Sequence, residues 1–169
     1  PSFARFKDFD CSGLVTVSLN HVVNDVRVDY AHIIDIDVVG HCADSIYSNA
    51  SFLVLPLYPH VEHRPTNKRI EDFFVDYPVL KKLDEEGRLI WYNASTSAMA
   101  NKNFPIIPVR YFSADAVVAL LAYSGVRDIR TLGVDGGISY SGVFSDLNEK
   151  TLLANGQPSF DLQFRAIAK

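Results

Sequence analysis

Two aspartates stand two residues apart in the stretch DIDVVGH, at the end of a run that reads as a buried strand. Residues two apart on a strand point to the same side, so Asp35 and Asp37 would project together while Ile36 faces the other way. Paired carboxylates at a strand end suit Mg²⁺ bound with substrate phosphates. They also suit the diol of a ribose. A solvated strand end that caps the next helix is the alternative interpretation.

The most polar loop of the chain, YPHVEHRPTNKR, gathers positive charge in a protein whose formal net charge is -4. It contains His60, His63, Arg64, Lys68 and Arg69. Such a loop could clamp a phosphate, with one histidine acting as general acid or base. His60 and His63 also have a loose H-x-x-H spacing, but no third metal ligand is near in sequence, so we assign no metal site. A plain solvated loop remains the alternative.

The stretch SLNHVVND places Asn20 and His21 directly after the first predicted strand. An asparagine amide has both donors and an acceptor, so at a strand end it could recognise the edge of a base or a ribose. Asparagine also favours turns and helix caps, which is the alternative here. We treat both residues as candidates for nucleotide binding.

The stretch GVDGGISYSGVF follows the last predicted strand. Asp135 would point into a cleft, Gly136 and Gly137 would let the backbone approach a ligand closely, and Tyr140 would line the wall. The spacing is not GxGxxG and no helix follows at once, so this is not the dinucleotide-binding fingerprint. A hairpin turn is the alternative.

These candidates follow strands of a predicted parallel sheet, because short β-branched runs alternate with helical patterns. The predicted strands are residues 14–19, 31–37, 51–57, 88–93, 106–111 and 129–134. Because it contains Pro108, the fifth should be an edge strand or an irregular one. The predicted helices are residues 38–49, 70–87 (broken at Pro78), 113–125 and 159–169. We expect a single Rossmann-like, three-layer α/β/α domain over residues 1–169, with a mostly parallel sheet of about six strands.

Composition narrows the classes of function. The 169 residues fit one domain, and 48% hydrophobic with 21% charged residues is typical of a globular protein. A net charge of -4 argues against a nucleic-acid surface. No apolar run approaches the roughly 20 residues that span a bilayer, and no signal peptide is recognisable. Cys11 and Cys42 have neither metal-ligand nor redox spacing and look like reduced cysteines, so a cytoplasmic location is expected. Because the sequence begins PSFARF rather than with Met, we expect a piece of a longer chain.

Two stretches carry a resemblance to a known family. The first is VTVSLNHVVNDVRVDYAHIIDID, in which a strand ends in Asn and a DY pair then leads into a strand that ends in Asp. The second is SADAVVALLAYSGVRDIRTLGVDGG, in which a buried helix precedes a strand that ends in Gly-x-Asp. This order resembles the Rossmann-like superfamily of archaeal 6-hydroxymethylpterin diphosphokinase-like proteins and bacterial CMP-sialic acid-dependent sialyltransferases. The resemblance covers roughly residues 14–135 and implies a nucleotide or nucleotide-sugar site, with Asn20, Asp35 and Asp135 at the matching positions.

The sialyltransferase branch of this superfamily also implies a histidine base, which leaves His21, His60 and His63 as alternatives. The family's opening strand and its Gly-rich GxGxS turn have no counterpart before Leu14. That departure puts in doubt whether the chain holds a donor phosphate as the family does.

We therefore expect a nucleotide-dependent transferase, most simply a glycosyltransferase-like domain with a nucleotide-sugar donor and a small-molecule or glycan acceptor. His60, His63 and Asp135 are the catalytic candidates. One alternative is a diphosphokinase-type transferase that uses ATP, with Mg²⁺ accompanying the nucleotide. The other is a Rossmann-like binding module without catalysis, which the missing Gly-rich turn favours.

Overall fold

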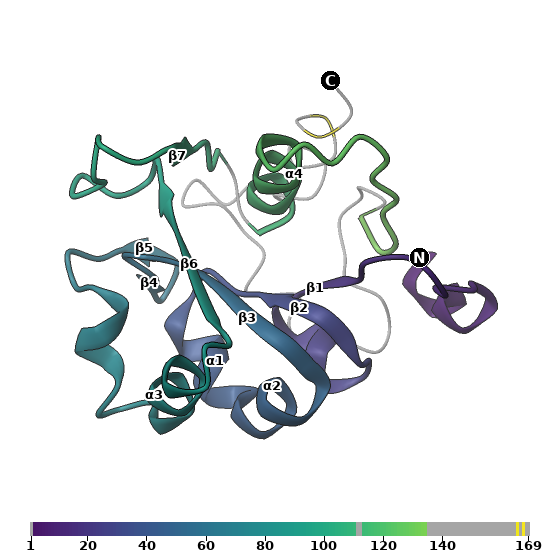
Figure 1. The fold of residues 1–169 in the computed structure, drawn as a ribbon, viewed down its shortest axis with the longest axis horizontal. Helices are drawn as coiled ribbons and strands as arrows, with labels where there is room; N and C mark the ends of the chain where they lie inside the picture. Colours follow the sequence, from purple (N-terminus) through teal and green to yellow (C-terminus); the bar gives the residue numbers. More distant parts are fainter. Residues whose placement is uncertain (1, 111–112, 135–164, 166, 168–169) are drawn as a thin grey trace.

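A five-stranded parallel sheet is the frame of the computed structural model, which describes residues 2–110, 113–134, 165 and 167 (Figure 1). Its strands are β1 (Val17–Leu19), β2 (Val28–His32), β3 (Ala50–Pro56), β6 (Leu89–Ala94) and β7 (Ile106–Ile107), hydrogen-bonded in that order. Each neighbouring pair is parallel. The predicted Rossmann-like α/β class is confirmed, with five described strands instead of six.

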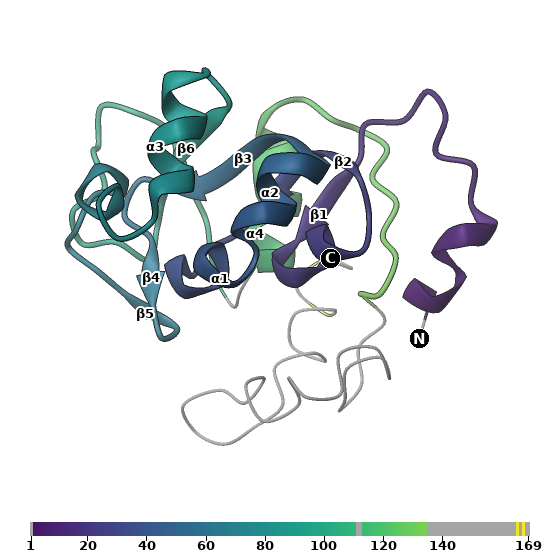
Figure 2. The ribbon, with the colours of Figure 1, turned by 90° about the horizontal axis from the view of Figure 1, so that it is seen from below.

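The strands follow one another across the sheet in chain order. Helices α1 (Ile36–His41), α2 (Ala43–Asn49) and α3 (Pro78–Glu85) lie on one face of the sheet, and α4 (Ser113–Tyr123) lies on the other (Figures 1 and 2). When each new strand lies on the same side of the one before it and the crossovers are right-handed, the connecting helices all lie on one face of the sheet. Helices α1, α2 and α3 follow this rule. The classical Rossmann order instead reverses direction and opens a crevice at the reversal. The described strands contain no such reversal.

Each face of the sheet has its own apolar core. The larger core lies under α1, α2 and α3 and contains the fully buried side chains Ile33, Ile36, Leu53, Leu55 and Leu80. The smaller core lies under α4 and contains Ile34, Val54, Tyr92, Ile107, Val109 and Ala116. Strands β2 and β3 contribute to both cores, because successive side chains of a strand point to opposite faces.

Short elements complete the described chain. Three of them are 3₁₀ helices: η1 (Ser2–Asp8) precedes β1, η2 (Asn20–Asn24) follows β1, and η3 (Ile70–Phe73) precedes α3. A small antiparallel hairpin is formed by β4 (His60–Val61) and β5 (Arg64–Pro65) after β3. The sequence pattern did not indicate this hairpin.

Helix α3 shows how local signals set an element's limits. Pro78 occupies its first turn, where a missing N–H costs no hydrogen bond. Leu80 and Leu83 are buried while most of their neighbours are exposed, which is the pattern of an amphipathic helix. Gly87 has φ 67° just beyond the helix, a conformation that glycine adopts without strain. The predicted break at Pro78 and stop at Gly87 are both confirmed.

The second strand was predicted in the wrong place. The structure ends β2 at His32, and Asp35 is the N-cap of α1, so residues 33–37 turn into a helix instead of extending a strand. The apolar residues from Ala31 to Ile36 are all buried, both within the strand and beyond its end, and for this reason the run could not reveal where the strand ended. Residues 38–49 do form helix, as α1 and α2 with a break at Cys42.

The predicted strand at residues 129–134 is absent from the described structure. Gly133 lies at φ 77° inside that segment, outside the β region, and residues 126–134 are exposed or half-buried. A buried helix was expected at residues 113–125, but only the first half of α4 is buried, and Tyr123 is exposed. Apart from Arg165 and Ile167, the predicted helix at residues 159–169 lies outside the described residues.

Candidate functional site

The carboxyl ends of the parallel strands bring several candidate residues to one edge of the sheet. Asn20 follows β1, Asp35 follows β2, His60 follows β3 and Thr96 follows β6. A β-bridge joins Asp35 to His60, and the His60 backbone N–H donates to the Ile34 carbonyl oxygen at 2.9 Å. The β4–β5 hairpin (residues 60–65) is therefore attached to this edge, beside α1.

Two carboxylates of α1 hold the tip of that hairpin. The Glu62 N–H donates to Asp37 Oδ2 at 2.7 Å, and the His63 N–H donates to Asp35 Oδ1 at 3.0 Å. His63 Nδ1 lies 3.2 Å from Asp35 Oδ2. Glu62 and His63 have φ 47° and 63°, the left-handed region that L-residues rarely adopt. Hydrogen bonds to ionised acceptors offset this strain because they are about twice as strong as neutral ones.

These contacts change the interpretation of the aspartate pair. Asp35 and Asp37 were predicted to share one side of a strand end and to suit Mg²⁺, but they lie at the start of a helix. Both Asp35 oxygens and one Asp37 oxygen accept hydrogen bonds from the hairpin, so the pair does not fit a cation site in this conformation. Among the described residues, no group of three or more His, Cys, Asp or Glu side chains could hold a metal ion.

His60 is a buried, neutral histidine. It is 8% exposed, and its Nε2 lies 3.2 Å from Thr96 Oγ1. Burial lowers the pKa of His60; the Asp35 carboxylate opposes this change, and His63 adds to it. At neutral pH the ring therefore carries a single proton and shares a hydrogen bond with Thr96 in a direction set by its tautomer.

His63 is oriented by Asp35 and remains half-exposed. Its side chain is 49% exposed, whereas the Asp35 side chain is 10% exposed. A carboxylate beside Nδ1 favours the tautomer with its proton on that nitrogen, which places the basic lone pair on Nε2. A carboxylate that fixes an imidazole in this way is the arrangement that prepares a histidine to accept a proton.

Asn20 and His21 point to different neighbours. Asn20 has φ 50°, and its Oδ1 accepts a hydrogen bond of 3.1 Å from the Ser113 hydroxyl at the start of α4. His21 lies in η2, and its ring stacks on that of His41 with 6.3 Å between centroids. Asn20 therefore faces the α4 side of the sheet, and His21 contacts the end of α1.

The remaining predicted residues divide into two groups. Arg64 lies on β5, paired with Val61 and exposed beside His63. The GVDGG candidates all lie outside the described residues: Asp135, Gly136, Gly137 and Tyr140.

A buried polar pair under α4 was missed by the sequence analysis. His32 is 1% exposed, and its Nε2 lies 2.9 Å from the Tyr92 hydroxyl. Burial lowers the His32 pKa to about 3, and within the described chain its Nδ1 has no hydrogen-bond partner. The histidine falls inside the apolar run AHIID, where no neighbouring polar residue indicates its partner on β6.

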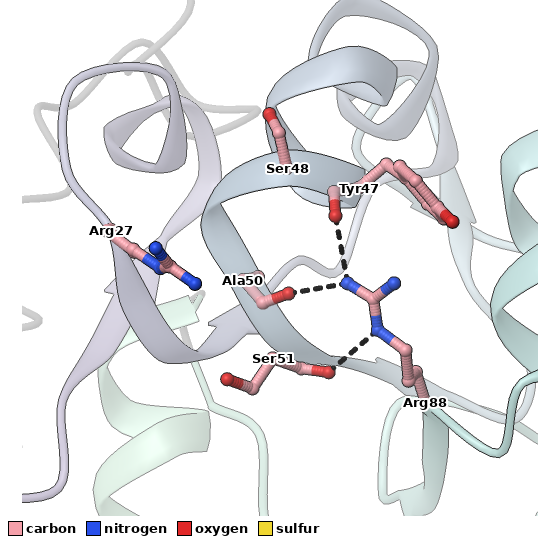
Figure 3. A pocket seen from close by; sticks show the side chains of 6 residues that line it. All are labelled: Arg27, Tyr47, Ser48, Ala50, Ser51 and Arg88. Atoms are coloured by element: carbon pink, nitrogen blue, oxygen red, sulfur yellow. Dashed lines mark hydrogen bonds between the residues drawn. The ribbon is translucent and has the colours of Figure 1, made fainter.

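A hollow of about 350 Å³ lies at the opposite, amino-terminal edge of the sheet. It is lined by Arg27, Tyr47, Ser48, Ala50, Ser51 and Arg88 (Figure 3). Two arginines facing one hollow suggest an anion site, but the contacts of Arg88 argue otherwise.

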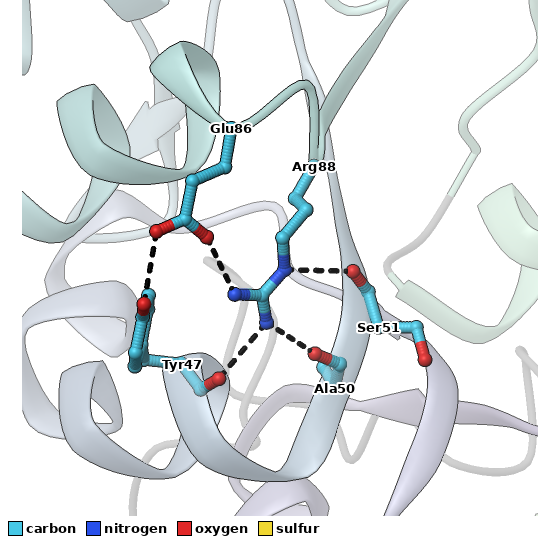
Figure 4. Close-up of polar contacts among 5 residues, drawn as sticks. All are labelled: Tyr47, Ala50, Ser51, Glu86 and Arg88. Carbon is cyan, nitrogen blue, oxygen red and sulfur yellow. Dashed lines mark hydrogen bonds and ion pairs between the residues drawn. The ribbon is translucent and has the colours of Figure 1, made fainter.

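The Arg88 guanidinium makes hydrogen bonds that join neighbouring elements of the fold (Figure 4). Its Nη2 donates to the Tyr47 and Ala50 carbonyl oxygens at 2.9 and 2.7 Å, and its Nε donates to the Ser51 carbonyl at 3.0 Å. Its Nη1 donates to Glu86 Oε2 at 2.8 Å, and the Tyr47 hydroxyl donates to the other oxygen of Glu86. Arg88 thus binds the carbonyls at the end of α2. We assign no ligand to this hollow.

No family model matches the chain, and neither a curated protein nor a solved structure was found to be similar to it. In the part of the chain that the structure describes, none of the helices is long and apolar enough to cross a membrane.

Proposed function

We propose that the chain is a nucleotide-dependent transferase that moves a sugar from a nucleotide-sugar to an acceptor hydroxyl, with His63 as the base. The observation that carries this proposal is the pairing of His63 with Asp35, in which both carboxylate oxygens accept hydrogen bonds from one residue. The pair stands at the carboxyl ends of parallel strands, where ligands of α/β proteins bind.

In the proposed reaction His63 Nε2 takes the proton of the acceptor hydroxyl. The acceptor oxygen forms a bond to the anomeric carbon of the donor sugar. The bond between that carbon and the nucleotide phosphate oxygen breaks, and its electron pair leaves with the nucleotide. Asp35 stabilises the imidazolium that forms, because its carboxylate already lies 3.2 Å from Nδ1.

Nearby side chains supply the contacts such a donor needs. Arg64, exposed on the same hairpin, is suited to the negative charge that develops on the leaving phosphate. Asn20, held by Ser113, is suited to a base or ribose edge. The diphosphokinase alternative is less favoured, because the carboxylates expected to bind Mg²⁺ are engaged by the hairpin. A cytoplasmic location is part of the proposal, supported by the free thiols of Cys11 and Cys42.

A thermal-shift panel with CMP, UDP, GDP and ATP, each with and without Mg²⁺ or Mn²⁺, tests nucleotide binding. We expect one nucleotide to raise Tm. Hydrolysis or transfer of the matching nucleotide-sugar should then fall by about 100-fold or more in His63→Gln, a typical effect of removing a general base, while the nucleotide Kd stays within about threefold. Asp35→Asn should lower the rate in the same way. If none of the nucleotides raised Tm, the proposal would be refuted.

The strand order favours a second candidate, a binding module without catalysis. The order of the described strands does not reverse, so these strands alone do not form the crevice in which Rossmann-like enzymes bind nucleotides. This candidate predicts neither a rise in Tm with any of the nucleotides nor turnover of any nucleotide-sugar.

A further inference from the structure

We infer that the tip of the β4–β5 hairpin is a lid, latched by Asp35 and Asp37, that opens to give a ligand access to the carboxyl edge of the sheet. Two polar side chains beneath and at the base of this hairpin are almost fully covered. Asp35 is 7% exposed and His60 is 8% exposed. A ligand larger than water reaches the Asp35 carboxylate only after the hairpin tip has moved.

The hairpin has a firmly attached base and a lightly attached tip. At the base, the His60 N–H donates to the Ile34 carbonyl and the Thr66 hydroxyl donates to the Pro59 carbonyl at 2.8 Å. Residues 62–65 at the tip are all exposed, so little apolar surface holds them in place. Segments with few buried apolar contacts open at a low free-energy cost. Movement about the base would release the tip and leave β3 intact.

The latch consists of the carboxylate contacts of α1. Asp37 accepts a hydrogen bond from the Glu62 N–H, and Asp35 accepts hydrogen bonds from both the backbone N–H and the ring Nδ1 of His63. The left-handed backbone of Glu62 and His63 is strained, and opening relieves that strain. Contacts that favour the closed state are thus opposed by strain within the same two residues, which keeps the open state accessible.

In the proposed function the base is carried by the hairpin itself, so the motion of the hairpin would control the pairing of the base with Asp35. Opening separates His63 from Asp35 and admits the donor, and closing restores the pair around the bound substrate. This gating role rests on the proposed function, whereas the opening motion does not. The motion can therefore be measured on the free protein, without a nucleotide.

Residue-resolved amide hydrogen exchange in low concentrations of denaturant measures the opening. The Glu62 and His63 amides should exchange through a local opening whose rate is independent of denaturant. The Leu53 amide, bonded to the Arg88 carbonyl in the sheet at 2.9 Å, should exchange only through denaturant-dependent global unfolding. Asp37→Ala should speed exchange of the two tip amides by about tenfold or more, since it removes a charge-assisted acceptor.

Two control variants accompany Asp37→Ala. Asp44→Ala removes an exposed acid from the first turn of α2 and should leave the tip amides unchanged. Asp37→Asn keeps an acceptor oxygen without the charge, so its effect should be intermediate, and it replaces Asp37→Ala if that variant fails to fold. The lid is disproved if the Glu62 and His63 amides exchange with the same free energy and denaturant dependence as Leu53. Local opening without nucleotide binding would refute the proposed function alone, and nucleotide binding without local opening would refute the lid alone.

Discussion

His63 and Asp35 illustrate how a pair of side chains obtains a role that neither has alone. Each was a candidate from the sequence, Asp35 as a ligand of Mg²⁺ or ribose and His63 as an acid or base. In the structure the carboxylate accepts two hydrogen bonds from His63, which fixes the imidazole and uses both oxygens. In the proposed function Asp35 therefore acts through His63, as a positioning residue.

His32 makes the stability of the fold depend on pH. Its pKa is about 3 in the folded protein, against an ordinary value of 6.5, so below pH 6.5 the unfolded chain binds a proton that the folded chain does not. Stability is then lost as the pH falls from 6.5 toward 3. Between pH 7 and pH 5 this loss is about 2 kcal/mol, because a difference of one bound proton between the two states changes stability by about 1.4 kcal/mol per pH unit.

The double variant His32→Phe/Tyr92→Phe removes the histidine together with the hydroxyl that would otherwise lose its partner. Urea unfolding at pH 7 and pH 5 should show that the double variant loses about 2 kcal/mol less stability than the wild type between the two values. An equal loss in both proteins would mean that His32 is not the source of this pH dependence.

At the scale of elements, Arg88 fastens the end of α2 to the start of β6. Arg88→Ala leaves three carbonyls, two of them part-buried, without this donor. We expect the free energy of unfolding to fall by about 1.5–3 kcal/mol, the usual range for hydrogen bonds to a charged group. Arg88→Lys should recover only part of this, because an ammonium cannot reproduce the planar fork.

Arg27→Ala is the matched control for Arg88, because Arg27 lines the same hollow. Arg27 is exposed, and no hydrogen bond or ion pair to it is found within the described residues. Its removal should change the free energy of unfolding by less than about 0.5 kcal/mol in the same urea titrations. A loss as large as that of Arg88→Ala would contradict the structural role given to Arg88.

Most elements could be predicted from local signals, and the hairpin at the site could not. Residues 51–57 and 88–93 agree with β3 and β6 to within one residue, because continuous apolar runs end in polar turns. The β4–β5 hairpin has two-residue strands and a left-handed tip without glycine. Carboxylates 25 and 28 residues away stabilise it, a tertiary effect that no local pattern reveals.

The same distinction applies to the site residues. Residue type and position after a strand correctly brought Asp35, His60 and His63 to one edge of the sheet. Which of them would pair depended on where β2 ended, and the apolar run gave no sign of that. Thr96 was missed because a threonine in a polar loop carries no signal until His60 is seen beside it at 3.2 Å.

At the scale of the whole molecule, the parallel sheet separates two polar regions. The carboxyl edge carries Asn20, the Asp35–His63 pair and Thr96, and the amino edge carries the arginine-lined hollow. The first region has an oriented histidine on the hairpin that we infer to be a lid, and the second has a guanidinium already bound to backbone carbonyls. For the proposed function we therefore favour the carboxyl edge as the nucleotide site, although the opposite edge has the more obvious positive charge.

Backbone chemical-shift mapping with the nucleotide that raises Tm tests this placement most directly. The account predicts that titration shifts the amide signals of Asn20, His63 and Thr96, while those of Ser51 and Arg88 remain unchanged. Shifts confined to Arg27, Ser51 and Arg88, with the signals of His63 and Thr96 unmoved, would contradict it.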